Sequence, residues 1–291
     1  MRRLLSALLA VAVTAVCLWF LLTPDIVCSL PDVVAKAKPL PLLIAFALGI
    51  LIQWLRAWRF TMLMAQGLAL PEARMVRIAF QLNFFNFLLP MRLGELSFPV
   101  LMRQRYGISL LRATGVLLLV RLFDLLNVGC ILLGAAAALN MLPSAGNWML
   151  VAGSVVLGLA PFAVLQIGKA VRPHVAKLPY VGTIADTLSA GLDAIHSLRM
   201  QVATIAVGLS VWLILGLMSI LVAGAVTDTI SPAAAMLGGA AGNLAFALPV
   251  NGIAGLGPAQ AAWVLAVVQA GAPLADAKVS ALALHAVVLV N

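Results

Sequence analysis

Two apolar segments of this chain are broken by a Leu-Pro pair and a glycine-containing turn, where a membrane helix would normally continue. The first break lies in Asn86–Glu95 (NFLLPMRLGE) and the second in Leu248–Gln260 (LPVNGIAGLGPAQ). Backbone polar groups cannot stay unpaired in hydrocarbon, so such breaks persist only where they are buried in protein or line a wet cavity. Because paired interruptions in two halves of a membrane protein mark transport sites, the breaks predict a carrier.

Composition fixes the class of protein. The chain is 64% hydrophobic and 9% charged, with a mean hydropathy of +1.14, whereas about a quarter of the residues of a soluble domain are charged. We therefore predict an all-α polytopic membrane protein, with residues 1–291 forming one transmembrane domain. The net charge of +9 comes from basic residues between apolar runs, which favours contact with anionic lipid headgroups and argues against nucleic acid.

Windows of about 20 apolar residues predict six transmembrane helices. They cover roughly residues 4–22, 40–60, 110–139, 148–168, 202–226 and 274–291, with the broken segments at about 78–102 and 233–269. The first span is longer than the apolar core of a signal peptide and lacks a cleavage site, so we expect an uncleaved anchor. The last span offers only about 25 Å of helix, so we expect the protein to continue beyond Asn291.

The loop charges predict the orientation, because lysine and arginine collect on the cytoplasmic side. With the N-terminus inside, thirteen basic residues fall in inside loops: Arg2, Arg3, Arg56, Arg59, Arg74, Arg77, Arg103, Arg105, Arg112, Lys169, Arg172, Lys177 and Arg199. Only Lys36, Lys38 and Lys278 fall outside. This assignment requires the first broken segment to return to the cytoplasm and the second to return outside. Both segments are therefore predicted to be re-entrant helical hairpins that enter from opposite faces.

An internal match supports an inverted repeat. Gly107, Leu110, Ala113 and Leu118 align without gaps on Gly271, Leu274, Ala277 and Leu282, and Arg121 then aligns on His285. Each half would hold a span, a hairpin and a span. The repeats are expected at about 40–140 and 202–291.

The segment at about 182–199 has helical periodicity, with apolar residues on one side and charged residues on the other. This pattern predicts an amphipathic helix on the cytoplasmic side. Two placements remain open, a helix lying on the membrane surface and a connector packed on the bundle.

Arg121 and Asp124 lie one turn apart at the predicted depth of the bilayer centre, and Asn127 follows. A charge there costs about 2.5–3.5 kcal/mol on insertion scales, so this stripe must face protein or water. One interpretation is a local Arg121–Asp124 ion pair that fixes packing. The other, which we favour, is the polar wall of a substrate cavity.

In the first hairpin Pro90 breaks the helix, and Gly94 allows a tight reversal. The polar candidates beside them are Asn86, Arg92 and Glu95. Arg92 could bind a lipid phosphate or only anchor the hairpin at the interface. Glu95 could pair with Arg121 or with a cationic headgroup.

The second hairpin carries glycines and amides around Pro249. The candidate binding residues are Asn243, Asn251 and Gln260, and the predicted break residues are Gly252, Gly255 and Gly257. Glycines permit φ > 0 turns, and turn amides can cradle an anion; tight packing through small residues is the alternative. His285, opposite Arg121 in the repeat, is a further candidate cavity group, although a single histidine in an apolar span is more often structural.

We predict no catalytic residue, no metal site and no cofactor. The sequence offers no serine–histidine–acid order, no paired-carboxylate site and no metal-ligand spacing, and its three cysteines are scattered.

The Asn86–Glu95 run, the Arg121-x-x-Asp124 pair and the turn at 248–257 resemble the flippase-like membrane domain of lysylphosphatidylglycerol synthases. The resemblance covers nearly the whole chain. It implies translocation of a lipid or lipid-linked headgroup, with aminoacylated phosphatidylglycerol, polyprenyl-linked sugars or hopanoids as family substrates. Gln260 stands where members usually carry a glutamate. The soluble aminoacyl-transfer domain has no counterpart in these 291 residues, so synthase activity is not implied.

The leading hypothesis is a lipid flippase of the bacterial cytoplasmic membrane, with anionic phospholipid, polyprenyl-linked lipid or hopanoid as the partner. The runner-up is a non-transporting protein that presents lipid to a glycosyltransferase or another lipid-modifying enzyme. A small-solute transporter and a membrane enzyme are weaker alternatives.

Overall fold

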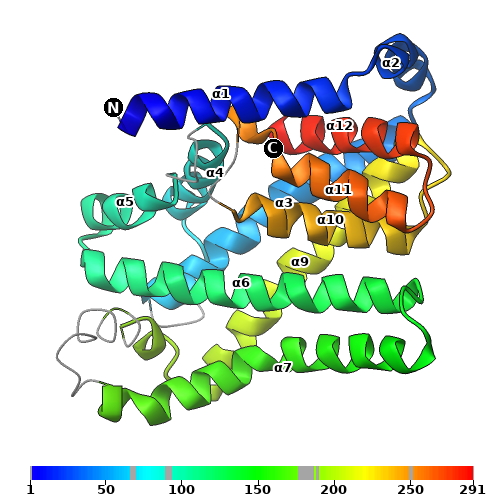
Figure 1. Cartoon of the computed structure of the whole chain (residues 1–291). Coiled ribbons are helices and arrows are strands. Elements are labelled where there is room, and N and C mark those ends of the chain that lie inside the picture. Colours follow the sequence, from blue (N-terminus) through cyan, green and yellow to red (C-terminus); the bar gives the residue numbers. More distant parts are fainter. Residues whose placement is uncertain are drawn as a thin grey trace.

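The structure is a computed structural model that describes residues 2–65, 70–88, 94–175, 187, 190–248 and 252–290. Every regular element within these ranges is a helix (Figure 1). In chain order they are α1 (Arg2–Leu21), α2 (Pro24–Lys36), α3 (Pro39–Ala65), α4 (Ala73–Leu88), α5 (Ser97–Tyr106), α6 (Leu110–Ala138), α7 (Ser144–Val175), α9 (Leu198–Val226), α10 (Pro232–Phe246), the short 3-10 helix η2 (Ile253–Gly255), α11 (Pro258–Gln269) and α12 (Leu274–Val290). The all-α prediction is confirmed for the described residues.

The six predicted spans coincide with α1, α3, α6, α7, α9 and α12. By length and hydropathy, α3, α6, α7 and α9 can each cross a membrane, and the bent pair of Val11–Leu21 and Pro24–Lys36 makes a possible fifth span. A crossing by α12, which has 17 residues, stays a prediction. The loop expected between the first two spans is wrong, since Pro24 at the first helical position begins α2.

The second broken segment forms a helix–break–helix hairpin, and the helices α4 and α5 lie on either side of the first. In the second, a Cβ on Gly238 would meet the Trp263 ring at 3.0 Å, and one on Gly242 would meet the Ala259 carbonyl oxygen at 3.0 Å. From the first of these contacts to the second, the residue number rises by four in α10 and falls by four in α11. The two helices therefore run antiparallel. The first hairpin brings α4 into contact with α5. Whether the two hairpins re-enter the membrane stays a prediction.

The two broken segments meet near the ends of α4 and α10. Phe87, near the end of α4, stacks on Phe246, at the end of α10, with ring centroids 5.3 Å apart. A Cβ added to Gly255 in η2 would approach the Phe87 ring to 2.6 Å. Figure 1 shows α4 and the α10–α11 pair approaching this point from opposite ends of the molecule.

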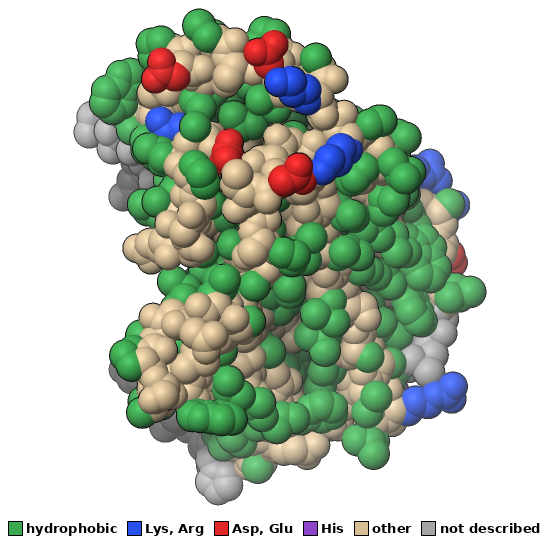
Figure 2. All heavy atoms as spheres, turned by 90° about the vertical axis from the view of Figure 1, so that its right-hand side faces the viewer, with side chains coloured by type: hydrophobic (Ala, Val, Ile, Leu, Met, Phe, Trp, Pro, Cys, Tyr) green, Lys and Arg blue, Asp and Glu red, His purple; other side chains and the backbone are tan. Residues whose placement is uncertain are grey.

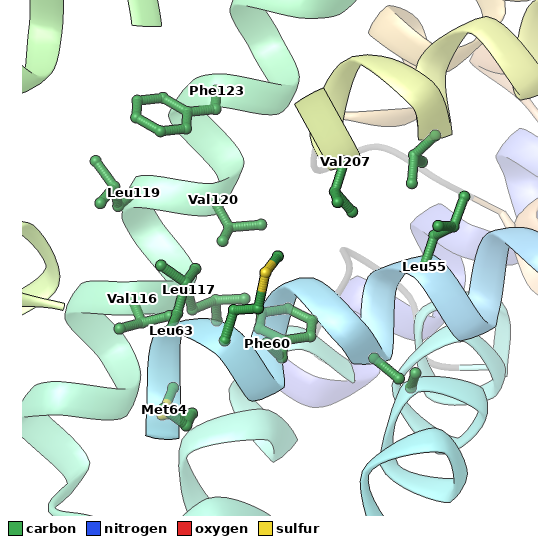
Figure 3. Packing of buried hydrophobic residues seen from close by; sticks show 14 of the residues in the cluster. Leu55, Phe60, Leu63, Met64, Val116, Leu117, Leu119, Val120, Phe123 and Val207 are labelled. Carbon is green, nitrogen blue, oxygen red and sulfur yellow. The ribbon is translucent and has the colours of Figure 1, made fainter. Parts of the chain in front are cut away.

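A packed core joins α3, α6 and α9 around the hairpins. Phe60 and Leu63 of α3 point toward Val116 and Val120 of α6, with Val207 of α9 beside them (Figure 3). Lipid tails are as apolar as these side chains, so close packing rather than the hydrophobic effect favours the contact. This core holds the helices that carry the charged residues described below.

The connections gather at two ends of the molecule (Figure 1). The N-terminus and the α5–α6 connection lie at one end; α2 and the α6–α7, α9–α10 and α11–α12 connections lie at the other. Figure 2 shows the second end, where charged side chains gather over α2 and the neighbouring loops, among them the exposed Lys38–Asp228 pair at 2.7 Å. Lys278 is not a loop residue as expected, because it is buried in α12 with Nζ 4.9 Å from the centroid of the Phe20 ring.

Most of the predicted amphipathic helix at 182–199 lies outside the described residues. Residues 190–193 are helical and 194–197 are not, and α9 begins at Leu198, where the Ser197 hydroxyl accepts from the Met200 N–H. Leu192 and Ile195 are buried in the main core. The described part therefore packs on the bundle, as a connector would.

Candidate functional site

A cavity of about 630 Å³ lies among the hairpin tips and the long helices, and residues of α3, α4, α6, α9, α10, η2, α11 and α12 line it. Eight residues singled out from the sequence border it: Asn86, Glu95, Arg121, Asp124, Asn243, Gly255, Gln260 and His285. Residues that are distant in the sequence and come from both halves of the chain are thus brought to one chamber.

Asp124 is the centre of the charged wall. Its carboxylate accepts two hydrogen bonds from Arg59 Nη2 at 2.8 and 3.0 Å, one from Trp212 Nε1 at 3.1 Å and one from Arg121 Nη1 at 3.2 Å. The residue is only 8% exposed. A buried carboxylate is costly unless it is paired and hydrogen-bonded, and here donors on α3, α6 and α9 supply that pairing.

Arg121 bridges the two acids of the cavity. Its Nε lies 3.1 Å from Glu95 Oε1, an ion pair without the alignment of a hydrogen bond, while Nη1 reaches Asp124. The predicted Glu95–Arg121 and Arg121–Asp124 pairs are both present. Because Arg121 also borders the cavity, the local ion pair and the cavity wall are not exclusive alternatives.

Arg59 was assigned to a loop by the sequence analysis, and this was wrong. The helix α3 continues to Ala65 and places Arg59 inside the bundle, 2% exposed. Gln53 and Arg56 on the same helix line the cavity. Residues 53, 56 and 59 recur at a spacing of three, which puts them on neighbouring positions of one helix surface. That spacing is the signal that could have identified Arg59.

The opposite wall is uncharged. Gln260 Oε1 accepts from the Gly257 N–H at 2.8 Å, which leaves Gln260 Nε2 to donate to His285 Nδ1 at 3.0 Å. An imidazole that accepts at Nδ1 carries its proton on Nε2 and is neutral. Asn243 donates from Nδ2 to the Gly239 carbonyl at 2.8 Å, and among the described residues no donor is bound to its side-chain oxygen.

Four backbone N–H groups in the described part of the second turn already have acceptors. The N–H of Gly252 donates to the Leu256 carbonyl at 2.7 Å, and that of Leu256 to the Ile253 carbonyl at 3.2 Å. The N–H of Ile253 donates to the Thr14 hydroxyl of α1 at 2.7 Å, and that of Gly257 is bound by Gln260. These four N–H groups are therefore engaged within the turn or by Thr14 of α1, and an anion cradle at the turn stays a prediction.

The local structure explains why glycine occupies several positions in the two breaks. Gly255 and Gly257 have φ values of 72° and 139°, which side chains rarely adopt. Gly252 lies against Thr14, and Gly94 lies against the backbone of Asn86, so a Cβ would clash at either position. Pro90, Arg92, Pro249 and Asn251 lie outside the described residues.

Within the described ranges, no group of three or more histidine, cysteine, aspartate or glutamate side chains lies close enough to hold a metal ion. The described residues of the site form ion pairs and hydrogen bonds around an open chamber. Such an arrangement suits the binding of a polar group inside an apolar bundle.

Residues 7–290 match the family model described as the lysylphosphatidylglycerol synthase TM region. No curated protein and no solved structure matches the chain. The family match covers nearly every residue, including both hairpins and both walls of the cavity. The chain therefore belongs to the family of the lysylphosphatidylglycerol synthase transmembrane region.

Proposed function

We propose that this protein moves a lipid, or a lipid-linked headgroup, between the leaflets of the bacterial cytoplasmic membrane, with its N-terminus in the cytoplasm. The observation that carries the proposal is the polar cavity among the hairpin tips of an otherwise apolar helical bundle. Family membership supports a membrane role connected with lipids. The proposal assigns no catalytic residue, metal or cofactor.

The cavity offers the hydrogen-bonding partners that a polar headgroup lacks in hydrocarbon. A polar group that leaves water without a compensating hydrogen bond loses several kcal/mol. Gln53 Oε1 and Asn86 Oδ1 are buried without a partner among the described residues, and both residues line the chamber. These two oxygens are covered as they stand, so a headgroup would reach them only after the side chains turn toward the chamber.

The cavity is also bordered by exposed apolar side chains. Leu96 and Leu125 line it and yet are 66% and 51% exposed. Acyl chains could therefore stay in the bilayer while the headgroup occupies the chamber. A small-solute site would have no need of such an apolar opening.

In this proposal the hairpins enter from opposite faces as an inverted repeat. The stacked Phe87 and Phe246 rings are the contact between them. Separation of either hairpin from this contact would open the chamber toward one face only, which is how alternating access operates in repeat-built carriers.

Reconstitution in liposomes with acyl-labelled lipids tests the proposal. We expect the protein to accelerate exchange between leaflets for at least one phospholipid or polyprenyl-linked lipid, and Arg121→Gln to slow that exchange at least about tenfold. Arg103→Gln, at an exposed position of α5, is the matched control and should leave the rate unchanged. Lipid that binds to the protein without any exchange would reject the flippase and favour the lipid-presenting partner.

A further inference from the structure

A chain of hydrogen bonds connects the wall of the cavity to the turn of the second hairpin. Gln260 is the third residue of α11, and its Oε1 accepts from the N–H of Gly257, directly before the helix, at 2.8 Å. Its Nε2 lies 3.0 Å from Nδ1 of His285 on α12. Gln260 is buried, and His285 lines the cavity. One amide thus connects a titratable side chain of the chamber to a backbone group of the turn.

Gly257 fixes the orientation of the Gln260 amide. A backbone N–H only donates, so the amide atom that faces Gly257 is the oxygen. The amide nitrogen then faces His285, and because it too only donates, the imidazole accepts at Nδ1 and carries its proton on Nε2. Turning the amide over would place its nitrogen against the Gly257 N–H, so the network assigns both atoms. The chain of hydrogen bonds is complete only while His285 is neutral.

Protonation of His285 breaks this chain. Both ring nitrogens of an imidazolium donate, so the Nδ1–H group would face the NH₂ group of Gln260. The amide can offer its oxygen to the imidazolium only by turning it away from Gly257, and otherwise the two donors separate. In the first case Gly257 loses its acceptor, and in the second Gln260 loses the contact that holds its side chain.

The charged groups around His285 do not replace the lost bond. Among the described residues that line the cavity, the acids are Glu95 and Asp124, and both are paired with Arg121. Arg56 of α3 lines the same cavity and would not attract an imidazolium. No residue of α11 is charged. The other charged residues on α12 and on the helices packed against it are Asp276 and Lys278 of α12, Arg2 and Arg3 of α1, Asp25, Asp32 and Lys36 of α2, Arg59 of α3 and Arg199 of α9.

The turn that would be released also takes part in the contact between the two broken segments. A Cβ on Gly255 would approach the Phe87 ring of α4 to 2.6 Å, so Gly255 lies directly against that ring. Gly257, two residues later, has a φ of 139°, and its N–H is bound only through Gln260 among the described residues. Loss of this bond would loosen the turn where it meets α4.

We propose that Gln260 and His285 form a proton-sensitive latch, which holds the turn of the second hairpin while His285 is neutral and releases it on protonation. The latch regulates the site of the proposed function and rests on that function only for its effect on transport. A loosened turn weakens the contact at Phe87, so acidification slows lipid exchange. Histidine suits this task because its charge ordinarily changes between about pH 5 and 8.

Hydrogen–deuterium exchange of the detergent-solubilised protein measures the latch without transport. Wild type and His285→Asn are compared at about pH 8 and about pH 5, each pair at one pH, so that the intrinsic pH dependence of exchange cancels. Asparagine keeps an oxygen that can accept from Gln260 but cannot be protonated. For the peptide that carries Gly257, we expect the ratio of wild-type to variant exchange rates to rise at least about threefold on acidification. A ratio that does not change with pH would overturn the latch.

Two further variants connect the response to this pair of side chains. In Gln260→Glu, a carboxylate accepts both from the Gly257 N–H and from a protonated Nδ1, so the turn should stay held at both pH values. His196→Asn makes the same change as His285→Asn at an exposed histidine and should keep the full wild-type response. A wild-type response in Gln260→Glu would show that it arises elsewhere in the molecule, and the latch would be wrong.

A transport arm separates this proposal from the proposed function. Acyl-labelled phosphatidylglycerol and a labelled polyprenyl phosphate are followed in proteoliposomes with the same pH on both sides. We expect wild-type exchange to fall at least about threefold from pH 8 to pH 5, and this fall to disappear in His285→Asn and in Gln260→Glu. If neither lipid is exchanged while the turn still responds through His285, the flippase fails and the latch stands. If lipid is exchanged equally fast at both pH values, the latch does not regulate transport.

Discussion

Asp124 shows how one side chain can determine both packing and chemistry. Asp124 lies on α6, and its hydrogen bonds with Arg59 of α3 and Trp212 of α9 link the three helices. It also fixes Arg121 on the wall of the cavity. Removing a partner from such a network leaves a buried charge without compensation, which costs far more than the pair itself contributes.

We therefore expect Asp124→Ala to lower the free energy of unfolding by about 3–5 kcal/mol, because Arg59 would remain buried without its anion. Asp228→Ala is the matched control, since it removes the acid of the exposed Lys38–Asp228 pair and should cost less than about 1 kcal/mol. Denaturant unfolding in detergent micelles, followed by tryptophan fluorescence, measures both changes. Equal losses would show that the Asp124 network does not hold the three helices together.

The sequence was sufficient to identify two of the charged residues that a membrane makes costly. Arg121 and Asp124 stand inside an apolar run, so hydropathy alone singles them out. It could not identify Arg59, because that residue stands at the predicted end of the span at 40–60, where arginine is usually interfacial. Trp212 was missed because a tryptophan in an apolar helix gives no sign that its N–H binds a carboxylate.

At the scale of elements, the second hairpin depends on a turn whose backbone N–H groups are bound by side chains of two helices, α1 and α11. Thr14 of α1 binds the Ile253 N–H, while Gln260 of α11 binds the Gly257 N–H. The Leu-Pro pair and the glycines predicted this break correctly, since few other residues accept such backbone angles. They could not predict the direction of its amides, which depends on contacts with α1 and α11.

We expect Gly257→Ala to disturb this tip, because φ at this position is 139° and a side chain there costs roughly 1–3 kcal/mol. The strain should loosen the Gln260–His285 contact and slow lipid exchange. Gly224→Ala is the control, since Gly224 lies in α9 with open space around it and alanine favours a helix. Stability and exchange are measured in parallel. Unchanged exchange in Gly257→Ala would mean that the tip does not shape the transport path.

At the scale of the whole molecule, the cavity depends on the two halves of the chain lying face to face. The loop charges required each broken segment to return to the side from which it came. The structure brings the two broken segments together at Phe87 and Phe246. Sequence reasoning could not supply the walls, because charge pairs such as Arg59–Asp124 join positions 65 residues apart.

Single cysteines test this topology in membranes, in a background that lacks Cys17, Cys28 and Cys130. Exposed positions flank each hairpin: Glu72 and Gln104 for the first, Asp228 and Ala275 for the second. An impermeant thiol reagent should label the first pair only from the cytoplasm and the second pair only from outside, because a hairpin returns its ends to one face. Opposite labelling within either pair would mean that this segment crosses the membrane. The cavity would then be enclosed by crossing helices, and the alternating separation of two opposed hairpins would no longer be a workable mechanism.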